Sequence, residues 1–372
     1  MRRLILVGGG HAHVFLIHGL ARRAVNDLEV VLISPYERHH YSGMVPGYLR
    51  GVYDDRDLTI DLPALCRAAD ARFVQALADS IHGPERIVHV ESDRLSFDLA
   101  SVDVGCDAAH LDIPGACDHA WTLRPMSRVA ALRDRLDSLL SNHPAGTPLA
   151  IAVVGGGAAG VEVALALDER VRRAGPTPQV TVFNAGGSIL PDYSAALRAR
   201  AEHILARRGV EVRTGRRVER VEPDGVVDST GERTPSHLTV WLTGAAPTAI
   251  LHASELPKDP HGYFLVDATL RSADGAPIWG AGDCIGIEGH PTLAKAGVYA
   301  VRESPILDRN IRTHLTGGTP VRYDPQSSFL ALLNTADGKA LLRWKAIISH
   351  SRWAWWLKDR IDRQFVGNYR TT

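Results

Sequence analysis

Hydrophobic positions near the start of the chain form two short unbroken runs, separated by glycines and a helical pattern. The mainly aliphatic segment 3–7 (RLILV) is followed by Gly8-Gly9-Gly10, then by a helical stretch to about Arg23, and then by a second apolar segment at 29–34 (EVVLIS). Short continuous apolar runs of this kind predict strands buried on both faces, and glycines at the junction predict a tight turn into a helix. The pattern therefore predicts a βαβ unit.

The same pattern returns 147 residues later, counted from Gly8 to Gly155. Residues 149–154 predict a strand, residues 155–160 (GGGAAG) a glycine turn, residues 161–173 a helix and residues 179–184 the next strand. Such a turn lets the backbone approach a diphosphate, which the helix N-terminus attracts. Two copies predict an α/β protein with two Rossmann-like dinucleotide-binding domains.

Both copies depart from the usual pattern of a dinucleotide site. His13 stands at the third glycine position of the first copy, so its helix packs less closely or shifts. Ser34 and Asn184 end the second strands, where a carboxylate normally binds the ribose 2′-hydroxyl. Asn184 lacks the charge that would repel a 2′-phosphate, but no arginine follows it in 185–190. The choice between NADH and NADPH stays open.

Three further runs, at 97–105, 237–247 and 276–284, predict strands that end at small residues or at a carboxylate. Two dinucleotide units suggest one flavin and one nicotinamide nucleotide. Asp283 follows Gly280-Ala281-Gly282, and a carboxylate there can accept a hydrogen bond from the polyol chain of a flavin. The simpler alternative for Asp283 is a helix N-cap.

Composition narrows the class of protein. The 372 residues carry 42 basic and 42 acidic side chains, and 45% are hydrophobic, which excludes global disorder and disfavours a nucleic-acid binder. No two of the four cysteines are spaced as C-x-x-C, so we expect no disulfide scaffold, no metal site and reduced thiols in a cytoplasmic protein. Apolar stretches at 1–20 and 148–167 are interrupted by glycines, histidines or Glu162, and predict no membrane span.

Several segments resemble a known family, the FAD-dependent pyridine nucleotide oxidoreductases with two dinucleotide-binding domains. Within that family the sequence is closest to the type II NADH dehydrogenase-like group. The most specific segments are GGGHAH at 8–13, YSGMVPGYLRGVY at 41–53, KAGVYAVRESP at 295–305 and WLKDRIDRQF at 356–365. They resemble a subfamily that also occurs fused to selenophosphate synthetase.

The resemblance implies a division of the chain and a set of roles. A split FAD-binding domain would span 1–115 and 255–325, an inserted NAD(P)H-binding domain 122–250, and a Trp-rich basic segment 326–372. Glu162 would lie close to the nicotinamide, or would only compensate the helix dipole. Where the segment 297–303 departs from the family pattern, Lys295 and Arg302 are instead candidates to stabilise an anionic reduced flavin or an oxyanion. The implied FAD contacts are Gly8, Gly10, His11, His13, Ser34, Gly43, Met44, Gly105, Gly282 and Asp283, and the implied NAD(P)H contacts are Gly155, Gly157, Gly160, Asn184 and Gly244.

The second substrate, a small-molecule electron acceptor, is less clear from the sequence. A quinone is the first candidate, although the segment 297–303 (GVYAVRE) lacks the glutamines that the resemblance leads one to expect. A sulfur or selenium species is the second, with Cys106 and Cys284 as neighbours of the flavin pocket. A flavin-binding protein with a degraded nicotinamide site is the third.

The C-terminal segment holds four of the seven tryptophans, among interleaved basic residues in 343–363. Tryptophan with lysine and arginine is typical of a peripheral membrane contact. The same composition suits a homodimer contact or packing on the FAD domain. We therefore expect a cytoplasmic protein, with contact to the inner face of the membrane through 344–363 as an open alternative. The tryptophans are Trp344, Trp353, Trp355 and Trp356.

Overall fold

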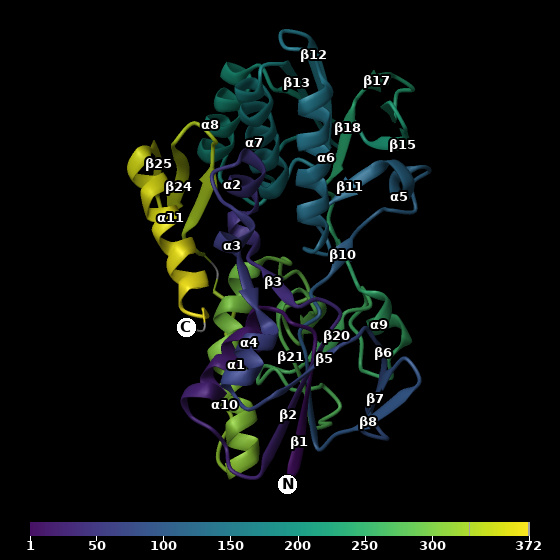
Figure 1. Ribbon diagram of the computed structural model, residues 1–372, viewed down its shortest axis with the longest axis vertical. Coiled ribbons are helices and arrows are strands. Elements are labelled where there is room, and N and C mark those ends of the chain that lie inside the picture. Colours follow the sequence, from purple (N-terminus) through teal and green to yellow (C-terminus); the bar gives the residue numbers. More distant parts are fainter. Residues whose placement is uncertain (327, 371–372) are drawn as a thin grey trace.

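The computed structural model describes residues 1–326 and 328–370 as two α/β units stacked end to end (Figure 1). The unit with the N-terminus lies at the bottom of the view, and the C-terminal segment, coloured yellow, lies along one side. Each unit is built on a parallel five-stranded sheet. The predicted pair of Rossmann-like units is confirmed.

The first sheet has the strand order β21-β9-β1-β2-β5. Its strands are β1 (Arg2–Val7), β2 (Leu28–Ser34), β5 (Arg72–Gln75), β9 (Leu99–Val102) and β21 (Ile278–Gly280). Helix α1 (His11–Arg22) packs on α4 (Leu62–Ala68) and α10 (Gly297–Thr316). Leu4, Ile5 and Leu6 are fully buried, as expected for a parallel strand covered on both faces.

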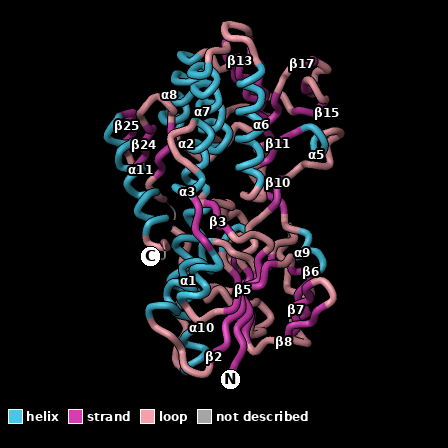
Figure 2. The backbone as a smooth tube through the Cα atoms, in the orientation of Figure 1, coloured by secondary structure: helices cyan, strands magenta, loops and turns pink. Residues whose placement is uncertain are grey.

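The second sheet has the order β11-β18-β12-β13-β14. Its strands are β11 (Ala120–Thr122), β12 (Pro148–Val154), β13 (Thr177–Asn184), β14 (Glu211–Thr214) and β18 (Leu238–Trp241). Figure 2 shows the helices of this unit beside its strands: α6 (Arg128–Asn142), α7 (Ala158–Ala174) and α8 (Ala195–Arg208). The runs expected at 97–105, 237–247 and 276–284 form the shorter strands β9, β18 and β21.

The two units share the arrangement of four strands and differ in the fifth, since β21 follows the other strands of its sheet in the chain and β11 precedes those of its own. In each, the strand before the glycine turn is central, and the next two parallel strands follow on one side. A three-stranded antiparallel insert precedes the strand on the other side. The inserts are β6 (Ala78–His82), β7 (Ile87–Val90) and β8 (Asp93–Ser96) in the first unit, and β15 (Val218–Glu222), β16 (Gly225–Asp228) and β17 (Arg233–Pro235) in the second.

Shorter elements connect the units and line the space between them. β10 pairs with β19 where the chain passes between the units, β3 pairs with β4, and β20 pairs with β22. The strands are β3 (Arg38–His40), β4 (Thr59–Asp61), β10 (Asp107–Ala108), β19 (Ala245–Ala246), β20 (Phe264–Val266) and β22 (Ile285–Ile287). The helices are η1 (Ser42–Met44), α2 (Val45–Arg50), α3 (Asp55–Leu58), α5 (Ala116–His119), α9 (Ala249–Ala253) and η2 (Gly282–Cys284).

The C-terminal segment is an antiparallel sheet followed by a helix. β23 (Ala331–Asn334), β24 (Ala340–Trp344) and β25 (Ile347–Ser351) lead into α11 (Arg352–Gly367), which packs on β24. The buried ammonium group of Lys358 donates to the Gly43 carbonyl at 2.8 Å and pairs with Asp362 at 2.9 Å. The Tyr53 hydroxyl donates to Asp359. Helix α11 is thus joined to the segment that follows β3.

No helix in the described ranges is both long and apolar enough to cross a lipid bilayer. The apolar stretches near the N-terminus and at 148–167 are instead the strand, turn and helix of the two βαβ units.

Candidate active site

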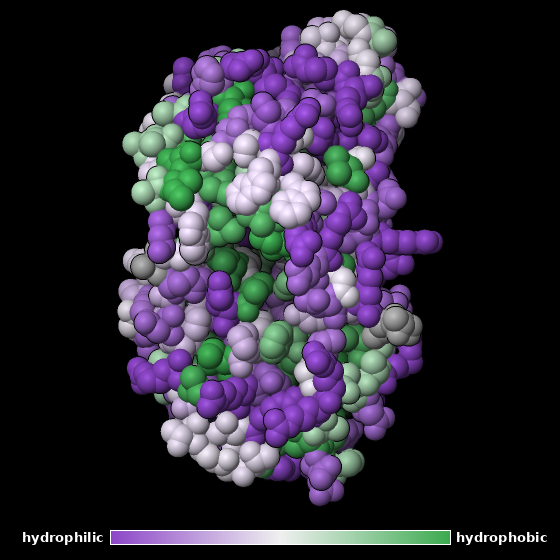
Figure 3. Space-filling model, turned by 90° about the vertical axis from the view of Figure 1, so that its left-hand side faces the viewer, coloured by the Kyte–Doolittle hydropathy of each residue, from purple (hydrophilic) through white to green (hydrophobic). Residues whose placement is uncertain are grey.

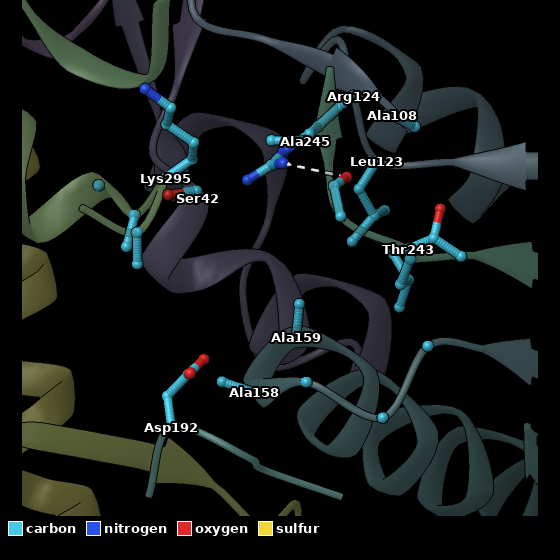
Figure 4. A pocket seen from close by; sticks show the side chains of 18 of the residues that line it. Ser42, Ala108, Leu123, Arg124, Ala158, Ala159, Asp192, Thr243, Ala245 and Lys295 are labelled. Atoms are coloured by element: carbon cyan, nitrogen blue, oxygen red, sulfur yellow. Dashed lines mark hydrogen bonds between the residues drawn. The ribbon is translucent and has the colours of Figure 1, made fainter. Parts of the chain in front are cut away.

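A cavity of about 1230 Å³ lies where the two units and the C-terminal segment meet. Figure 3 shows the hollow on the side of the molecule that carries α11, with hydrophobic residues gathered around it. Figure 4 shows Ser42, Arg124 and Lys295 around one end of the cavity and Ala158 and Asp192 toward the other. Its walls come from separate segments of the chain, so the site exists only in the folded protein.

The second glycine turn opens directly into this cavity. Gly155, at φ +126°, leaves no room for a side chain, because a Cβ there would lie 2.3 Å from the Leu242 carbonyl oxygen. Gly160 lets α7 contact the turn, because its Cβ would lie 1.8 Å from the Gly155 oxygen. A Cβ on Gly157 would meet no atom within 4 Å, and this residue lines the cavity. The N-terminus of α7 is therefore free to bind an anionic diphosphate.

Asn184 lies at the end of β13 and lines the cavity, as a ribose contact must. Its side-chain amide donates to the carbonyls of Gly186 and Ser188 at 2.8 and 2.9 Å, so it organises the loop that follows. Two residues that were not expected from the sequence line the same wall, Arg216 and Arg217. They follow β14, the next parallel strand. Two consecutive arginines after that strand are the sequence feature that could have predicted their place in the cavity.

Glu162 lies on α7, lines the cavity and is half-buried beside the C-terminal segment. Its carboxylate accepts the Asn334 amide at 2.6 Å. Burial raises the pKa of Glu162 to about 7, against the opposing effect of the nearby Lys358. A carboxyl group with such a pKa exchanges protons near neutral pH.

Only some of the residues predicted at the flavin end of the site line the cavity. Gly43, Gly244 and Lys295 line it, whereas Met44 is fully buried behind it. The Lys295 ammonium donates to the Ile285 carbonyl and lies 3.9 Å from the centroid of the Tyr263 ring. Burial lowers the pKa of Lys295.

The Asp283 carboxylate is already hydrogen-bonded to neighbouring side chains. Its carboxylate accepts from the Arg124 guanidinium and from the Cys106 thiol, both at 3.3 Å. Gly105 turns the chain at φ +70° just before that thiol, and the Gly282 amide donates to the buried Glu303 carboxylate at 2.6 Å. Any polyol hydroxyl at Asp283 would share the carboxylate with Arg124.

The first glycine turn differs from the second, because a carboxylate of the protein lies at its helix N-terminus. Asp103 follows β9, and its buried Oδ2 accepts the Ala12 amide at 2.8 Å and the His13 amide at 3.2 Å. A Cβ on Gly10 would lie 2.2 Å from Asp103 Oδ1. Burial raises the pKa of Asp103 to about 7. Two amides that a diphosphate could use are therefore already hydrogen-bonded.

The rest of the first turn is also covered by side chains. A Cβ on Gly9 would lie 2.5 Å from Leu62. The His13 ring is buried and bonds the Gly8 carbonyl at 2.6 Å and the Ser101 hydroxyl at 2.9 Å. Ser34 donates to the Tyr36 carbonyl within the turn after β2. His13 thus fills the space that a third glycine would leave, and α1 lies correspondingly further from the turn.

Two buried histidine nitrogens near this turn lack hydrogen-bond partners, and they test whether FAD fits. His11 and His39 have ring centroids 4.5 Å apart, and Nε2 of each is buried without a partner. Burial lowers the pKa of both rings, to about 4 for His11, so both are neutral. Protonation beside a phosphate would turn these nitrogens into donors. These two nitrogens fit a phosphate-bearing cofactor such as FAD, whereas the Asp103 carboxylate would repel a diphosphate at this turn.

The cysteines are not arranged for redox catalysis. Cys106 and Cys284 are buried, and burial raises the pKa of both thiols, so both are protonated. Cys66 is buried too, whereas Cys117 is exposed. Within the described residues, no group of three or more histidine, cysteine or acidic side chains is placed to hold a metal ion.

The chain is similar in sequence to several known proteins. The chain is 21% identical over 310 residues to the NADH dehydrogenase-like protein YutJ of Bacillus subtilis, covering 83% of this chain and 84% of that protein. It is 24% identical over 359 residues to the demethylphylloquinone reductase NdbB of Synechocystis, covering 91% and 86%. Both relatives match over most of the chain.

Solved structures show the same fold. A sulfide:quinone oxidoreductase from Aquifex aeolicus superposes with a TM-score of 0.83 at 19% identity, covering all of this chain and 92% of that one. NDH2 from Plasmodium falciparum in complex with NADH gives 0.82 at 15% identity, covering 99% and 97%.

A family model described as pyridine nucleotide-disulphide oxidoreductase matches residues 2–300, which include both parallel sheets. The type II NADH dehydrogenase-like resemblance is confirmed by the relatives. The chain therefore belongs to the pyridine nucleotide-disulphide oxidoreductase family of FAD-dependent enzymes that use NAD(P)H.

Proposed function

We propose that this oxidoreductase takes electrons from NAD(P)H through FAD and passes them to a quinone-type acceptor. The observation that carries the proposal is the shared cavity: the free N-terminus of α7 and the Lys295 end open into the same space. A nucleotide bound by its diphosphate at Gly155–Gly157 would extend its nicotinamide into the same space. The printed names of the Synechocystis and Aquifex proteins support a quinone as acceptor.

We assign the first sheet to FAD, with 1–115 and 255–325 as its domain, 122–250 as the NAD(P)H domain and 326–372 as the C-terminal segment. The support is that β21, from residues 278–280, completes the first sheet, whereas the second sheet is built from 120–241. Gly8, Gly10, His11 and His39 would then approach the FAD diphosphate.

Bound FAD supplies the hydride acceptance and the electron transfer that no side chain provides. Lys295 contributes a positive charge at the ring end of the cavity, beside Tyr263. Glu162 exchanges protons with the cavity near neutral pH, since burial has raised its pKa to about 7. Gly155 and Gly157 hold the diphosphate, and Gly160 keeps α7 against the turn.

Two other interpretations find less support in the site. A reaction with sulfur or selenium through a cysteine thiolate is disfavoured, because burial raises the pKa of Cys106 and Cys284 and keeps both protonated. A degraded nicotinamide site would be blocked or filled, but the second turn is open.

Anaerobic rapid mixing of the flavin-loaded protein with NADH and with NADPH tests the proposal. We expect bleaching of the flavin absorbance by at least one nucleotide, and reoxidation by soluble quinones faster than by polysulfide or selenite. If neither nucleotide bleaches the flavin, or if polysulfide is the faster oxidant, the proposed function is wrong.

The C-terminal segment supports membrane contact as a second part of the proposal. Trp344, Ile347, Trp353 and Trp356 are exposed, with side chains between 45% and 61% accessible, and we call them the tail patch. Basic neighbours stay at the surface, with Arg360 over the Trp356 ring. Lys358 is not part of this surface, because it is buried in an ion pair with Asp362. Trp355 does not belong to the patch either, because it stacks on Tyr53.

We propose that the tail patch binds an anionic membrane surface, where a lipid-soluble quinone would be available. In co-sedimentation with anionic liposomes, Trp353→Ala/Trp356→Ala should lose most binding, while Leu77→Ala, an exposed apolar residue elsewhere, should not. Binding that survives the double variant would contradict membrane contact. A monomer–dimer shift in the double variant would instead assign the patch to a homodimer.

A further inference from the structure

We propose that the nucleotide site selects NADPH over NADH, and that Arg217 binds the 2′-phosphate that distinguishes them. The inference rests on the proposed function, since it names the electron donor of the same site. It extends that function by naming Arg217, which lies outside the glycine motifs and cannot be identified from them.

The ribose end of the cavity has no carboxylate. Asn184 ends β13, and its side-chain amide nitrogen donates to two loop carbonyls. The acids that line the cavity within the described chain are Glu162 and Asp192. Glu162 contacts Asn334 of the C-terminal segment, and Asp192 is close enough to Tyr299 of α10 to raise its pKa. Neither stands at the ribose end to repel a 2′-phosphate.

The segment after β14 brings two arginines to that end. The Arg216 amide donates to the Asn184 carbonyl at 3.0 Å, and the Gly215 amide donates to the Gly186 carbonyl at 2.9 Å. These bonds fasten the arginine segment to the loop that would hold the ribose. Arg216 and Arg217 both line the cavity there, next to Asn184.

The two arginines differ in their partners. The Arg216 guanidinium is 3.0 Å from buried Asp228 and 3.4 Å from Glu232, so its charge is already neutralised. Arg217 is exposed, and no acidic side chain in the described part of the chain forms an ion pair with it. Arg217 is thus the cation that remains available for a ligand at this wall.

A 2′-phosphate and a 2′-hydroxyl make opposite demands on the protein. A carboxylate binds the hydroxyl and repels the phosphate, whereas an arginine near the strand end accommodates the phosphate. An arginine–phosphate contact is a charge-assisted hydrogen bond and is among the stronger polar contacts in proteins. Asn184 with Arg217 provides the second arrangement, so we expect a preference for NADPH of at least about tenfold in kcat/KM.

The test compares both nucleotides in the flavin-loaded protein and in its variants. Arg217→Ala should lower kcat/KM for NADPH roughly 10- to 100-fold and leave the value for NADH nearly unchanged, and Arg217→Lys should fall between. Arg207→Ala, an exposed arginine at the end of α8 that does not line the cavity, is the matched control. Calorimetric titration with 2′,5′-ADP and 5′-AMP measures the same preference without turnover.

The outcomes separate this inference from the proposed function. Equal or better use of NADH by the unchanged protein, or an equal loss for both nucleotides in Arg217→Ala, would overturn the choice of NADPH while leaving the NAD(P)H dehydrogenase function in place. If neither nucleotide reduces the flavin, the proposed function fails, but the titration still tests the 2′-phosphate site. Tighter binding of 2′,5′-ADP than of 5′-AMP that is lost in Arg217→Ala supports this site. Equal binding of the two ligands rejects it.

Discussion

The two glycine turns of this protein have the same fold around them, yet they offer different surfaces to a ligand. A Cβ on Gly8 would meet the Asp103 carbonyl at 2.3 Å, and a Cβ on Gly155 would meet the Leu242 carbonyl at 2.3 Å. Asp103 and Leu242 therefore occupy equivalent positions. The carboxylate of Asp103 occupies the N-terminus of α1, while α7 keeps its N-terminus open. A residue on a neighbouring strand, outside the motif, sets this difference.

The third position of the motif shows a second difference. Gly160 allows α7 to touch the turn, whereas His13 fills a larger gap and bonds Gly8 and Ser101. With α1 in its present position, a glycine in place of His13 would leave empty space and would not improve the packing of α1 on the turn. The motif must be judged with its neighbours, because packing and hydrogen bonding decide which residue suits it.

Adding a carboxylate to the open second turn should have the largest effect, because it removes the difference between the two turns. Gly157→Asp should weaken NAD(P)H binding at least about a hundredfold, because the new carboxylate would cap α7 and repel the diphosphate. The φ of −72° and the free space around Gly157 allow the side chain. Nucleotide titration of the flavin-loaded protein measures the effect.

Gly157→Asn is the control for that experiment, because it adds similar volume without charge. It should lose much less affinity, and flavin content should be normal in both variants. Equal nucleotide affinity in Gly157→Asp and the unchanged protein would show that α7 does not bind the diphosphate.

Restoring the ideal motif in the first turn should be harmful. His13→Gly should lower the free energy of unfolding by about 2–4 kcal/mol, because it leaves a cavity and removes two hydrogen bonds. Urea unfolding gives the value. An unchanged or increased stability would mean that α1 moves in to close the gap.

Removing the Asp103 charge at the first turn should strengthen FAD binding. Asp103→Asn keeps an acceptor for the Ala12 and His13 amides but no longer repels a phosphate, so we expect FAD to bind roughly tenfold more tightly. Flavin dissociation, followed by fluorescence, measures the change. FAD that binds equally or more weakly would show that Asp103 does not oppose the diphosphate.

The same variant should alter the pH dependence of stability. Burial raises the pKa of Asp103 to about 7, above its usual value of about 4, so its stabilising contribution is full below about pH 4 and is lost as the pH rises through 7. Asp103→Asn should therefore gain stability relative to the unchanged protein between about pH 5 and pH 8, read as melting temperature. A constant difference across that range would contradict the raised pKa.

The smallest effect concerns the acid beside the open turn. Glu162→Gln should remove a step near pH 7 from the pH profile of flavin reduction, where burial places the pKa of Glu162, and lower the rate only a few-fold. Asp192→Asn, the other acid on the cavity wall, should keep the step. A step that persists in Glu162→Gln would assign it to another group.

The sequence pattern predicted most of the fold because aliphatic runs and glycine turns are local signals. It placed the strands at 3–7, 29–34, 149–154 and 179–184 close to their observed bounds. The site was harder to predict, because its side chains meet across the fold. Asp103 lies in a run that predicts a strand, but nothing local shows that its carboxylate reaches α1.

Arg217 and Lys358 illustrate the same limit. Arg217 follows β14, and only the order of the strands brings it beside Asn184. Lys358 stands among tryptophans and arginines that indicate a surface, yet Asp362 and the Gly43 carbonyl hold it in the interior. Local composition indicates that a charge is present, but not which tertiary partner neutralises it.

The position of β21 has a consequence for how the protein is made. Residues 278–280 pair with β9, which the ribosome produces about 175 residues earlier, counting from Leu99–Val102 to Ile278–Gly280. During that interval the nascent chain carries an unpaired strand edge, and by its end all strands of the second sheet have been made. The second unit thus has all its strands before the first unit does, and the first unit must wait for a strand that is synthesised after the second unit.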